Sequence, residues 1–241
     1  MRLPSIAAAL LAIAAPAAAQ PQPHEPTDPY RITMLRAAPG QWVAMRAKIE
    51  ALGEQGSIGE DGCTIPFRIR HSQGDQWDFM LLQPYDSFQA YFANDCDDPA
   101  WRRAIAEHAD FESDWFANGP SHGLMQSTAA ETGLFHLEMF KARAGMKDVL
   151  LDSRIRENAI FADIGMRQNF IWAGNLGSDY DVMTIGMHTT WATYAEHNAA
   201  GTDVEWATYS RRHGYDGGSD LAPQLRSFLT SHNDGFAVPM Q

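Results

Sequence analysis

Apolar and polar positions along the chain predict a strand, a helix and a hairpin in succession. Residues 30–35 carry Tyr, Ile and Met at every second position, which is typical of a β-strand. A Pro-Gly turn follows, and apolar residues then recur at helical spacing at Trp42, Met45, Ile49 and Leu52. Two further strands, 64–71 and 77–83, flank a Ser-Gln-Gly-Asp turn and predict a hairpin. A short helix is expected from Asp86, with Ser87 as its N-cap.

The same order of elements is predicted again in the second half of the chain. The expected segments are Leu134–Lys141, Met146–Ala162, Asn169–Ala173, Asp181–His188 and Trp191–Asn198. An additional helical stretch is expected at Trp101–Phe116. Its counterpart, Glu205–Thr230, is interrupted by a Gly-Gly pair.

Four pairs of segments resemble each other in the same order, which indicates an internal repeat. Tyr30–Gly40 resembles Phe135–Gly145 at an offset of 105 residues. Two pairs have an offset of 103 residues, namely Trp77–Leu82 with Tyr180–Ile185 and Asp86–Tyr91 with Thr189–Tyr194. The fourth pair sets Gly123–Met125 against Gly235–Ala237 at an offset of 112 residues.

Strand, helix, hairpin, helix and a final strand make the β-α-β-β-α-β unit of the ferredoxin-like fold. We therefore predict an α+β protein of two tandem ferredoxin-like repeats, residues 30–131 and 132–241, with antiparallel sheets packed face to face as an α/β barrel.

On this element order and repeat, residues 30–241 resemble the dimeric α/β-barrel superfamily in a tandem single-chain form. Within it, the chain is most similar to the NIPSNAP-like and antibiotic-biosynthesis-monooxygenase-like groups. The resemblance implies that the space between the sheets serves a small-molecule ligand, a haem or cofactor-free oxygen chemistry.

The N-terminus has the pattern of an exported protein. A positively charged start is followed by the apolar run Ile6–Ala15 and by Ala17-x-Ala19, the small-residue pattern that a signal peptidase reads. We expect a signal peptide at 1–19, a Pro-rich, poorly ordered leader at 20–29, and a periplasmic or secreted location. The apolar run is too short to span a bilayer, and we expect no membrane insertion.

Composition and charge exclude several classes of protein. Hydrophobic residues make up 45% of the chain, which is enough to build a core. The chain has 18 basic and 30 acidic residues, and this net charge of −12 argues against nucleic acid as a partner. No motif typical of a zinc site, a phosphate-binding loop or a serine hydrolase occurs. The sequence therefore predicts no metal site and leaves the cofactor open.

The strongest candidate site lies on two central strands of the second half. His136 and Glu138 share one face of their strand, which we expect to look between the sheets. Thr184 and His188 share a face of the neighbouring antiparallel strand. Glu138 or His188 would act as general base with His136 as its partner, because a carboxylate can orient an imidazole and raise its basicity. The same residue types also bind metals. The structural alternatives are a buried, satisfied His-Glu pair or outward-facing residues on an edge.

The first half carries arginines on the corresponding strands. Arg31 stands where the second half has His136, and Arg68 and Arg70 alternate along the next strand. Buried arginine needs a partner, so these residues indicate either an anionic ligand group or acidic side chains nearby, with ordinary solvent exposure as the alternative. Trp172 is a candidate for stacking on an aromatic ligand, or else belongs to the core.

Three functions fit these observations. The first is the binding of a small, aromatic or apolar molecule between the two sheets. The second is a cofactor-free, metal-assisted or haem-assisted oxygenase, lyase or isomerase in the same cavity. The third is a structural or interaction protein whose cavity is filled by side chains. The oligomeric state is left open, and a monomer is compatible with the tandem form.

Cys63 and Cys96 are the two cysteines of the chain. In an oxidising compartment two cysteines are expected to form a disulfide. The predicted topology argues against it, because the two cysteines fall at opposite ends of an ideal ferredoxin-like unit. The bridge therefore requires the glycine-rich loop 53–62 to carry Cys63 across the domain.

Overall fold

Eight antiparallel strands form a closed barrel in the order β1-β3-β2-β8-β5-β7-β6-β4. The computed structural model describes residues 24–59, 62–73, 76–94, 96 and 98–240. The expected signal peptide lies outside the described residues. No helix among the described residues combines the length and the apolar character needed to cross a membrane.

The two halves of the chain contribute four neighbouring strands each. The first half comprises β1 (Asp28–Ala37), α1 (Trp42–Glu50), β2 (Phe67–Gln73), β3 (Phe79–Pro84), α2 (Phe88–Ala93), α3 (Pro99–Ala106), β4 (Ala109–Gly119) and α4 (His122–Ala129). The second half comprises β5 (Leu134–Ala142), α5 (Lys147–Ile164), β6 (Phe170–Leu176), β7 (Val182–His188), α6 (Trp191–Asn198), α7 (Asp203–Arg212), the 3₁₀ turn η1 (Gly218–Asp220), α8 (Leu221–Phe228) and β8 (Leu229–Pro239).

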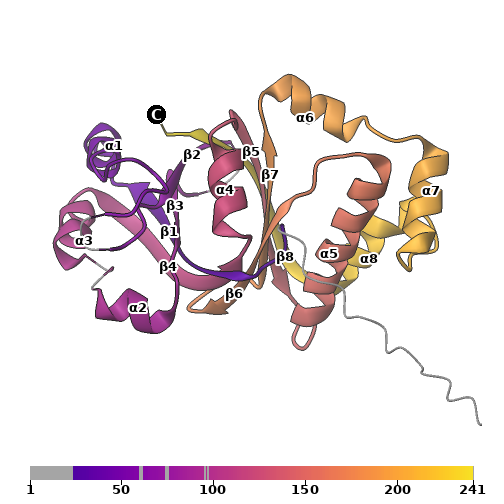
Figure 1. Ribbon diagram of the computed structural model, residues 1–241, viewed down its shortest axis with the longest axis horizontal. Coiled ribbons are helices and arrows are strands. Elements are labelled where there is room, and N and C mark those ends of the chain that lie inside the picture. Colours follow the sequence, from indigo (N-terminus) through magenta and orange to yellow (C-terminus); the bar gives the residue numbers. More distant parts are fainter. Residues whose placement is uncertain (1–23, 60–61, 74–75, 95, 97, 241) are drawn as a thin grey trace, which may run out of the picture.

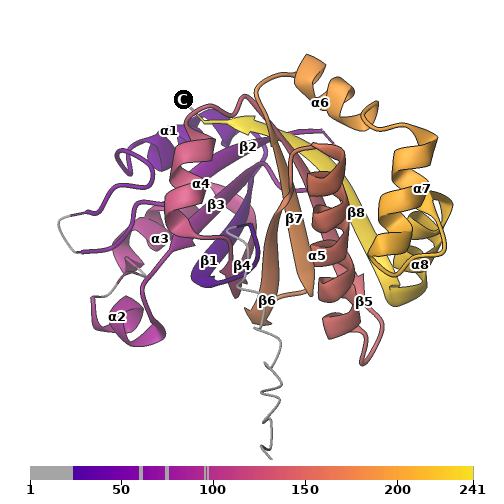
Figure 2. The same cartoon turned by 45° about the vertical axis from the view of Figure 1, so that its right-hand side comes forward.

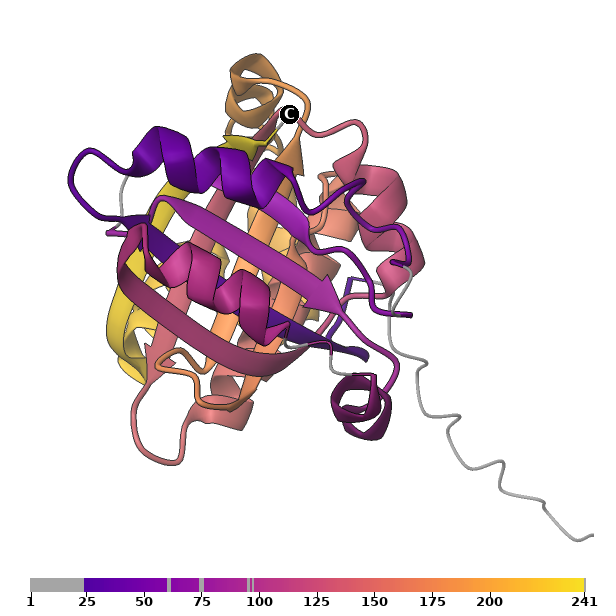
Figure 3. The same cartoon turned by 90° about the vertical axis from the view of Figure 1, so that its left-hand side faces the viewer.

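Helices cover the barrel on two opposite sides. Figure 1 shows α1, α2 and α3 on one side and α5, α7 and α8 on the other, with the strands between them. Figure 3 looks onto the first of these sides, and Figure 2 shows β5, β7 and β8 running beside α5. The predicted α+β barrel is therefore confirmed, and its two sheets are joined at both edges by the β2–β8 and β4–β6 pairs.

Local sequence signals explain where several helices begin and end. The side chain of Ser87 caps α2 by accepting a hydrogen bond from the backbone N–H of Ala90. Thr190 and Thr202 form capping boxes at the starts of α6 and α7. Helix α5 ends at Gly165, whose φ of 83° lies in the left-handed region that favours glycine.

The barrel interior is packed with apolar side chains. Its cluster takes residues from all eight strands, among them Tyr30, Ile32, Phe67, Leu82, Trp115, Leu137, Trp172, Ile185 and Ala237. Met125 of α4 joins the same cluster. The space between the sheets, where the sequence predicted a ligand, is therefore filled by this apolar cluster.

One strand was missed between α3 and α4. The sequence predicted a helix over Trp101–Phe116, but the helix ends at Ala106 and β4 begins at Ala109. The segment Ala109–Gly119 alternates between the barrel interior and the outside, and its charged residues on the outer face hid that period of two. Gly123–Met125 lies in helix α4, whereas its proposed counterpart Gly235–Ala237 lies in strand β8, so the fourth proposed pair of similar segments was wrong.

Part of the predicted leader packs against the barrel. The carbonyl of His24 accepts a hydrogen bond from the backbone N–H of Ile171, and the His24 ring lies 5.0 Å from that of Phe170. The backbone N–H of Thr27 donates to the carbonyl of Gly119. Backbone pairing thus orders this end of the leader, and the folded part begins before Tyr30.

Cys63 and Cys96 form a disulfide, with their Cα atoms 5.6 Å apart. The expected bridge is confirmed. The turn before β2 is folded by backbone hydrogen bonds such as that from Gly59 N–H to the carbonyl of Cys63. This turn brings Cys63 beside the end of α2, where Cys96 lies, which is how the objection from topology is resolved.

Candidate functional site

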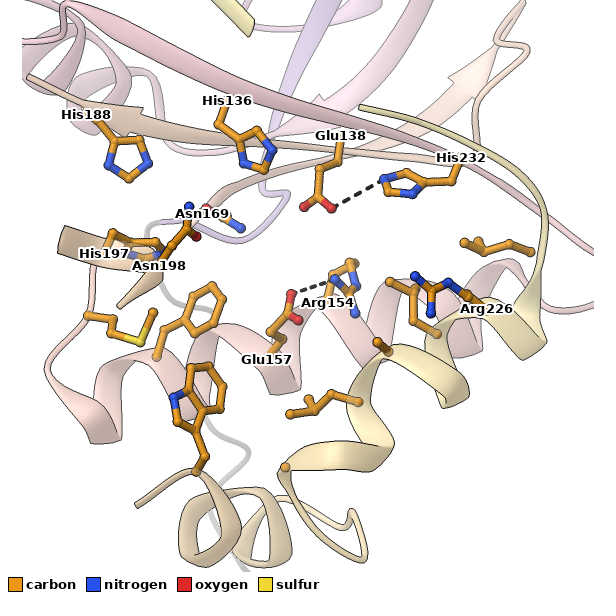
Figure 4. A pocket seen from close by; sticks show the side chains of 18 residues that line it. His136, Glu138, Arg154, Glu157, Asn169, His188, His197, Asn198, Arg226 and His232 are labelled. Carbon is orange, nitrogen blue, oxygen red and sulfur yellow. Dashed lines mark hydrogen bonds and ion pairs between the residues drawn. The ribbon is translucent and has the colours of Figure 1, made fainter. Parts of the chain in front are cut away.

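A cavity of about 490 Å³ lies on the outer face of the second-half strands, beneath helices α5, α7 and α8. Figure 4 shows its polar side chains: those on the strands point toward those on α5 across the cavity. We call it the second-half cavity. It is lined by His136, Glu138, Arg154, Glu157, Phe161, Met166, Asn169, His188, His197, Asn198, Trp206, Gly218, Leu221, Ala222, Leu225, Arg226, Leu229 and His232.

The predicted site residues therefore face the opposite way from the expectation. Phe135, Leu137 and Met139 fill the barrel, whereas His136 and Glu138 point outward to the helices. The alternation of β5 separates its two faces, but both carry large apolar residues. The sequence pattern alone could not tell which face turns inward.

Register brings the predicted residues of β5 and β7 together. Glu138 lies opposite Thr184, and the Thr184 hydroxyl donates to Glu138 Oε2 at 3.1 Å. His136 and His188 line the same cavity. His136 does not bind Glu138, however, because its Nε2 lies 2.8 Å from Asp234 Oδ1 on β8.

Glu138 is a carboxylate held in its charged form. Its Oε1 lies 3.3 Å from His232 Nε2, and its side chain is 17% exposed. Burial opposes ionisation, but the hydrogen bond to His232 and the positive charge of Arg154 outweigh burial. The pKa of Glu138 therefore lies below its usual range.

Glu157 on α5 has the opposite character. Its Oε2 accepts a hydrogen bond from Arg154 Nη1 at 2.5 Å, and Arg154 is almost completely buried. Burial, reinforced by the negative charge of Glu138, outweighs the attraction of Arg154 and raises the pKa of Glu157. Two carboxyl groups of one cavity are thus pushed toward different protonation states, an arrangement that suits an acid and a base.

At one end of the cavity, His188 and His197 favour the neutral imidazole. Burial, followed by the charges of His197 and His136, lowers the pKa of His188 to about 4. Burial also lowers the pKa of His197. The ring of Tyr194 on α6 packs against two histidine rings here, with centroid distances of 5.2 Å to His136 and 5.3 Å to His188.

Two features of the backbone position this end of the cavity. The Asn158 side chain donates to the carbonyl of Asn169 at 2.7 Å and accepts from its N–H at 2.8 Å, which fixes the residue that enters β6. Gly186 lies opposite His136 in the register. A Cβ atom at Gly186 would lie 2.9 Å from Asn169 Oδ1 and 3.1 Å from His188 Nε2, so this close approach needs glycine.

Apart from Asn198 and Arg226, the remaining walls are largely apolar. They are formed by Phe161, Met166, Trp206, Leu221, Leu225 and Leu229. The cavity thus combines an apolar body with a polar centre of His and Glu, as small-molecule sites do. Among the described residues no three His, Cys, Asp or Glu side chains are grouped closely enough to hold a metal ion, so we derive no step through a metal.

The first-half candidates are spread over three places. Arg31 lies in a separate cavity, and its guanidinium binds both oxygens of Asp114 at 2.7 and 2.6 Å. Arg68 is buried and donates to the carbonyls of Ile49 and Gly53, which stabilises the end of α1. Arg70 borders another depression of the surface.

Trp172 belongs to the barrel interior, where its ring packs edge-on against Tyr30 at 5.9 Å. Stacking on a ligand in the second-half cavity is therefore excluded for Trp172.

Seven polar residues of the second-half cavity were not among the predicted site residues, namely Arg154, Glu157, Asn169, His197, Asn198, Arg226 and His232. A weak signal existed for two of them. Arg154 and Glu157 follow Leu150 at helical spacing, so they continue the buried face of α5. Charged residues at positions where a helix should be apolar point to a functional site.

No protein-family model matches the sequence, and no curated protein matches it. Solved structures resemble it in fold. A proposed monooxygenase from Lactobacillus acidophilus aligns with a TM-score of 0.57 and 11% identity, covering 89% of this chain and 95% of that one. A proposed monooxygenase from Fusobacterium nucleatum aligns with a TM-score of 0.58 and 9% identity, covering 89% and 93%.

An anthrone oxidase-like protein aligns with a TM-score of 0.56 and 8% identity, covering 90% of this chain and 93% of that one. At these identities the comparisons establish the fold and nothing further. The chain shares the fold of these three structures, with its eight strands closed into one barrel.

Proposed function

We propose that this protein binds a small molecule with an apolar body and a polar group in the second-half cavity. The observation that carries the proposal is the cavity itself, in which apolar walls surround Glu138, Glu157 and the neutral His188. The polar group of the ligand would lie between Glu138 on β5 and Glu157 on α5, which face each other in Figure 4. Its apolar body would pack against side chains such as Phe161 and Leu225.

The same geometry favours an enzyme as the second candidate. Glu138 would serve as general base, because its lowered pKa keeps it deprotonated and Thr184 and His232 orient its two oxygens. Glu157, whose pKa is raised, would serve as general acid. This assignment refines the expectation that His136 pairs with Glu138, since His136 pairs with Asp234 instead.

A cofactor-free oxygenase is the reaction class that fits this candidate best. Removing a proton from an acidic C–H or O–H group is the step that Glu138 would perform. The names of the similar structures support this class by analogy only. The closer relation to the antibiotic-biosynthesis-monooxygenase-like or NIPSNAP-like groups is part of the same proposal.

Native mass spectrometry of the protein after export in a bacterial host tests the binding function. We expect an additional mass of a few hundred daltons on the wild type, and its loss in Leu225→Phe, which narrows the cavity. Leu52→Phe, in the separate first-half cavity, is the matched control and should keep the mass. No bound molecule, or equal binding in all three proteins, would contradict the proposal.

Turnover separates the two candidates. In an enzyme, Glu138→Gln should keep the bound molecule and lower kcat by about 10²–10⁴-fold, the usual contribution of a general base. In a binding protein the molecule would be released unchanged by the wild type.

We also propose that the tandem form arose by duplication of one unit. Each half has its strands in the same relative order, with β4-β1-β3-β2 matching β8-β5-β7-β6. Arg31 binds Asp114 on the neighbouring strand, and His136 binds Asp234 in the same way. The register supports the match: Thr33 lies opposite Asp114, and Glu138 lies opposite Asp234.

Aromatic residues beside these two pairs also occupy matching positions in the two halves. Tyr91 of α2 accepts a hydrogen bond from Arg31 and packs on Phe116 at 5.6 Å. Tyr194 of α6 packs on His136 at 5.2 Å and on Phe236 at 5.1 Å. An experimental structure in which the two halves fail to superpose at these positions would overturn the duplication.

Export to the periplasm or the medium, by way of a cleaved signal peptide at 1–19, is our proposal for the location of the protein. The Cys63–Cys96 disulfide supports it, because disulfides persist in oxidising compartments. N-terminal sequencing of the exported protein tests it, with a start at Gln20 expected. We propose that the protein does not bind nucleic acid and does not insert into a membrane. We propose that it works as a monomer.

A further inference from the structure

A second, smaller cavity of about 350 Å³ lies on the outer face of the first half. We call it the first-half cavity. It lies over β1 and β3, between the end of α1 and α3, and it shares no lining residue with the second-half cavity. Arg31 and Thr33 occupy in it the strand positions that His136 and Glu138 occupy in the other. Its volume is within the range of small-molecule sites.

The charged groups of this cavity already have partners within the protein. Asp114 accepts hydrogen bonds from Arg31, from the Thr33 hydroxyl at 2.8 Å and from Arg102 at 3.0 Å. Arg102 also binds Glu112 at 2.5 Å. Two guanidinium groups are thus matched by two carboxylates. A third carboxylate, Asp98, also lines the cavity and accepts hydrogen bonds from the backbone N–H groups of Ala100 and Trp101 at the start of α3. A charged ligand would have to give up its water without gaining an opposite charge, which is costly.

The other walls are apolar and held in place. Leu52, Ile65, Pro66, Leu81 and Trp101 contribute apolar surface. Cys63 and Cys96 both line the cavity, and the disulfide between them ties the segment before β2 to the chain before α3. A wall fixed in this way is preorganised, which lowers the entropic cost of binding.

We propose that the first-half cavity is a second binding site, which takes a neutral aromatic or alicyclic molecule. The apolar walls supply the binding surface, and the ring of Trp101 supplies a face for stacking. The internally matched charges select against anions and cations. This site differs from the second-half cavity, whose Glu138 and Glu157 call for a ligand with a polar group, and the inference does not depend on the function proposed for that cavity.

Titration of the full chain with p-cresol, followed by ¹⁵N–¹H NMR, tests the site. The indole N–H signal of Trp101 reports on the first-half cavity and is assigned with Trp101→Phe. We expect this signal to shift in a saturable way. The anion p-toluate, which has the same ring and methyl group, should bind at least tenfold more weakly.

Two variants locate the binding. Leu52→Phe narrows the first-half cavity and should weaken p-cresol binding at least tenfold, as read from the Trp101 signal. Leu225→Phe narrows the second-half cavity and should leave the Trp101 titration unchanged. The absence of any shift, an equal response in Leu52→Phe, or equal affinity for p-toluate would each overturn the inference. Binding seen only at the Trp206 indole would overturn it as well, because the ligand would then occupy the second-half cavity alone.

Discussion

The two halves of the barrel place a basic residue, an aspartate and a tyrosine at matching positions, but they use them differently. In the first half, Arg31 binds Asp114 with two hydrogen bonds, and Asp114 is only 24% exposed. In the second half, His136 makes one contact to Asp234, which is 55% exposed. The planar guanidinium of Arg31 binds both oxygens of its carboxylate, whereas the imidazole of His136 contacts only one.

The comparison shows why a shared scaffold need not mean a shared function. Side chains of the first half satisfy one another and stabilise the fold. Side chains of the second half leave Glu138 and Glu157 facing a cavity with opposite pKa shifts. We therefore expect substitutions in the Arg31–Asp114 pair to cost stability, and substitutions of Glu138 or Glu157 to cost function.

The largest expected loss of stability follows removal of the disulfide. The double variant Cys63→Ser, Cys96→Ser should lower the free energy of unfolding by about 3–4 kcal/mol, because the bridge closes a loop with a sequence separation of 33 residues. Urea unfolding of the oxidised wild type and of the variant measures the difference. An unchanged midpoint and slope would show that the bridge does not restrain the unfolded chain.

Arg31→Gln should lower the free energy of unfolding by about 3 kcal/mol, because it breaks a buried ion pair and leaves Asp114 with fewer partners. Urea unfolding at pH 7 measures the loss. A loss below about 1 kcal/mol would mean that the Arg31–Asp114 pair is no stronger than an exposed ion pair. It would contradict the difference that we draw between the two halves.

His188 should make the stability of the wild type depend on pH. Its pKa is about 4 in the folded protein, against the ordinary histidine value of 6.5 in the unfolded chain. Between these values the unfolded chain takes up a proton that the folded chain does not. Stability is therefore complete above pH 6.5 and falls by about 3 kcal/mol as the pH drops to about 4.

The variant His188→Gln should lack this part of the pH dependence. Denaturant unfolding of both proteins from about pH 7.5 to about pH 4 gives the difference directly. Parallel curves for the two proteins would mean that His188 titrates normally and that the histidine end of the cavity is not desolvated.

The smallest expected effect on stability is that of His136→Gln. The pair with Asp234 is partly exposed, so the loss should stay within about 1 kcal/mol. Ligand retention in native mass spectrometry should decrease, because His136 lines the cavity. A large loss of stability with unchanged ligand retention would reverse the roles that we assign to the two halves.

Much of the fold could be predicted from the alternation of apolar and polar residues in the strands and from the resemblance between the two halves of the chain. The alternation in β1 and β5, the hairpins and the capped helix at Ser87 are local signals, and the structure follows them. Strand β4 was missed because Asp110, Glu112 and Asp114 place charges on its outer face, where they pair with arginines that the sequence alone does not bring near.

The candidate site was predictable only in part. The register of β5 and β7 could be inferred, and it brings Glu138 to Thr184. The inward face could not be inferred, because it is decided by which apolar set fills a closed barrel. Glu157 lies on the next element, α5, and His232 lies on the last strand, β8, so only the fold brings them to the same cavity as His136.

Crystallographic soaking with a set of small aromatic alcohols and ketones tests the central claim most directly, namely that the functional cavity lies outside the barrel. We expect electron density between the outer face of β5 and β7 and helices α5 and α8, with a polar atom within hydrogen-bond distance of Glu138 or Glu157. Density inside the barrel beside Trp172, or no bound molecule on the second-half face, would contradict the account.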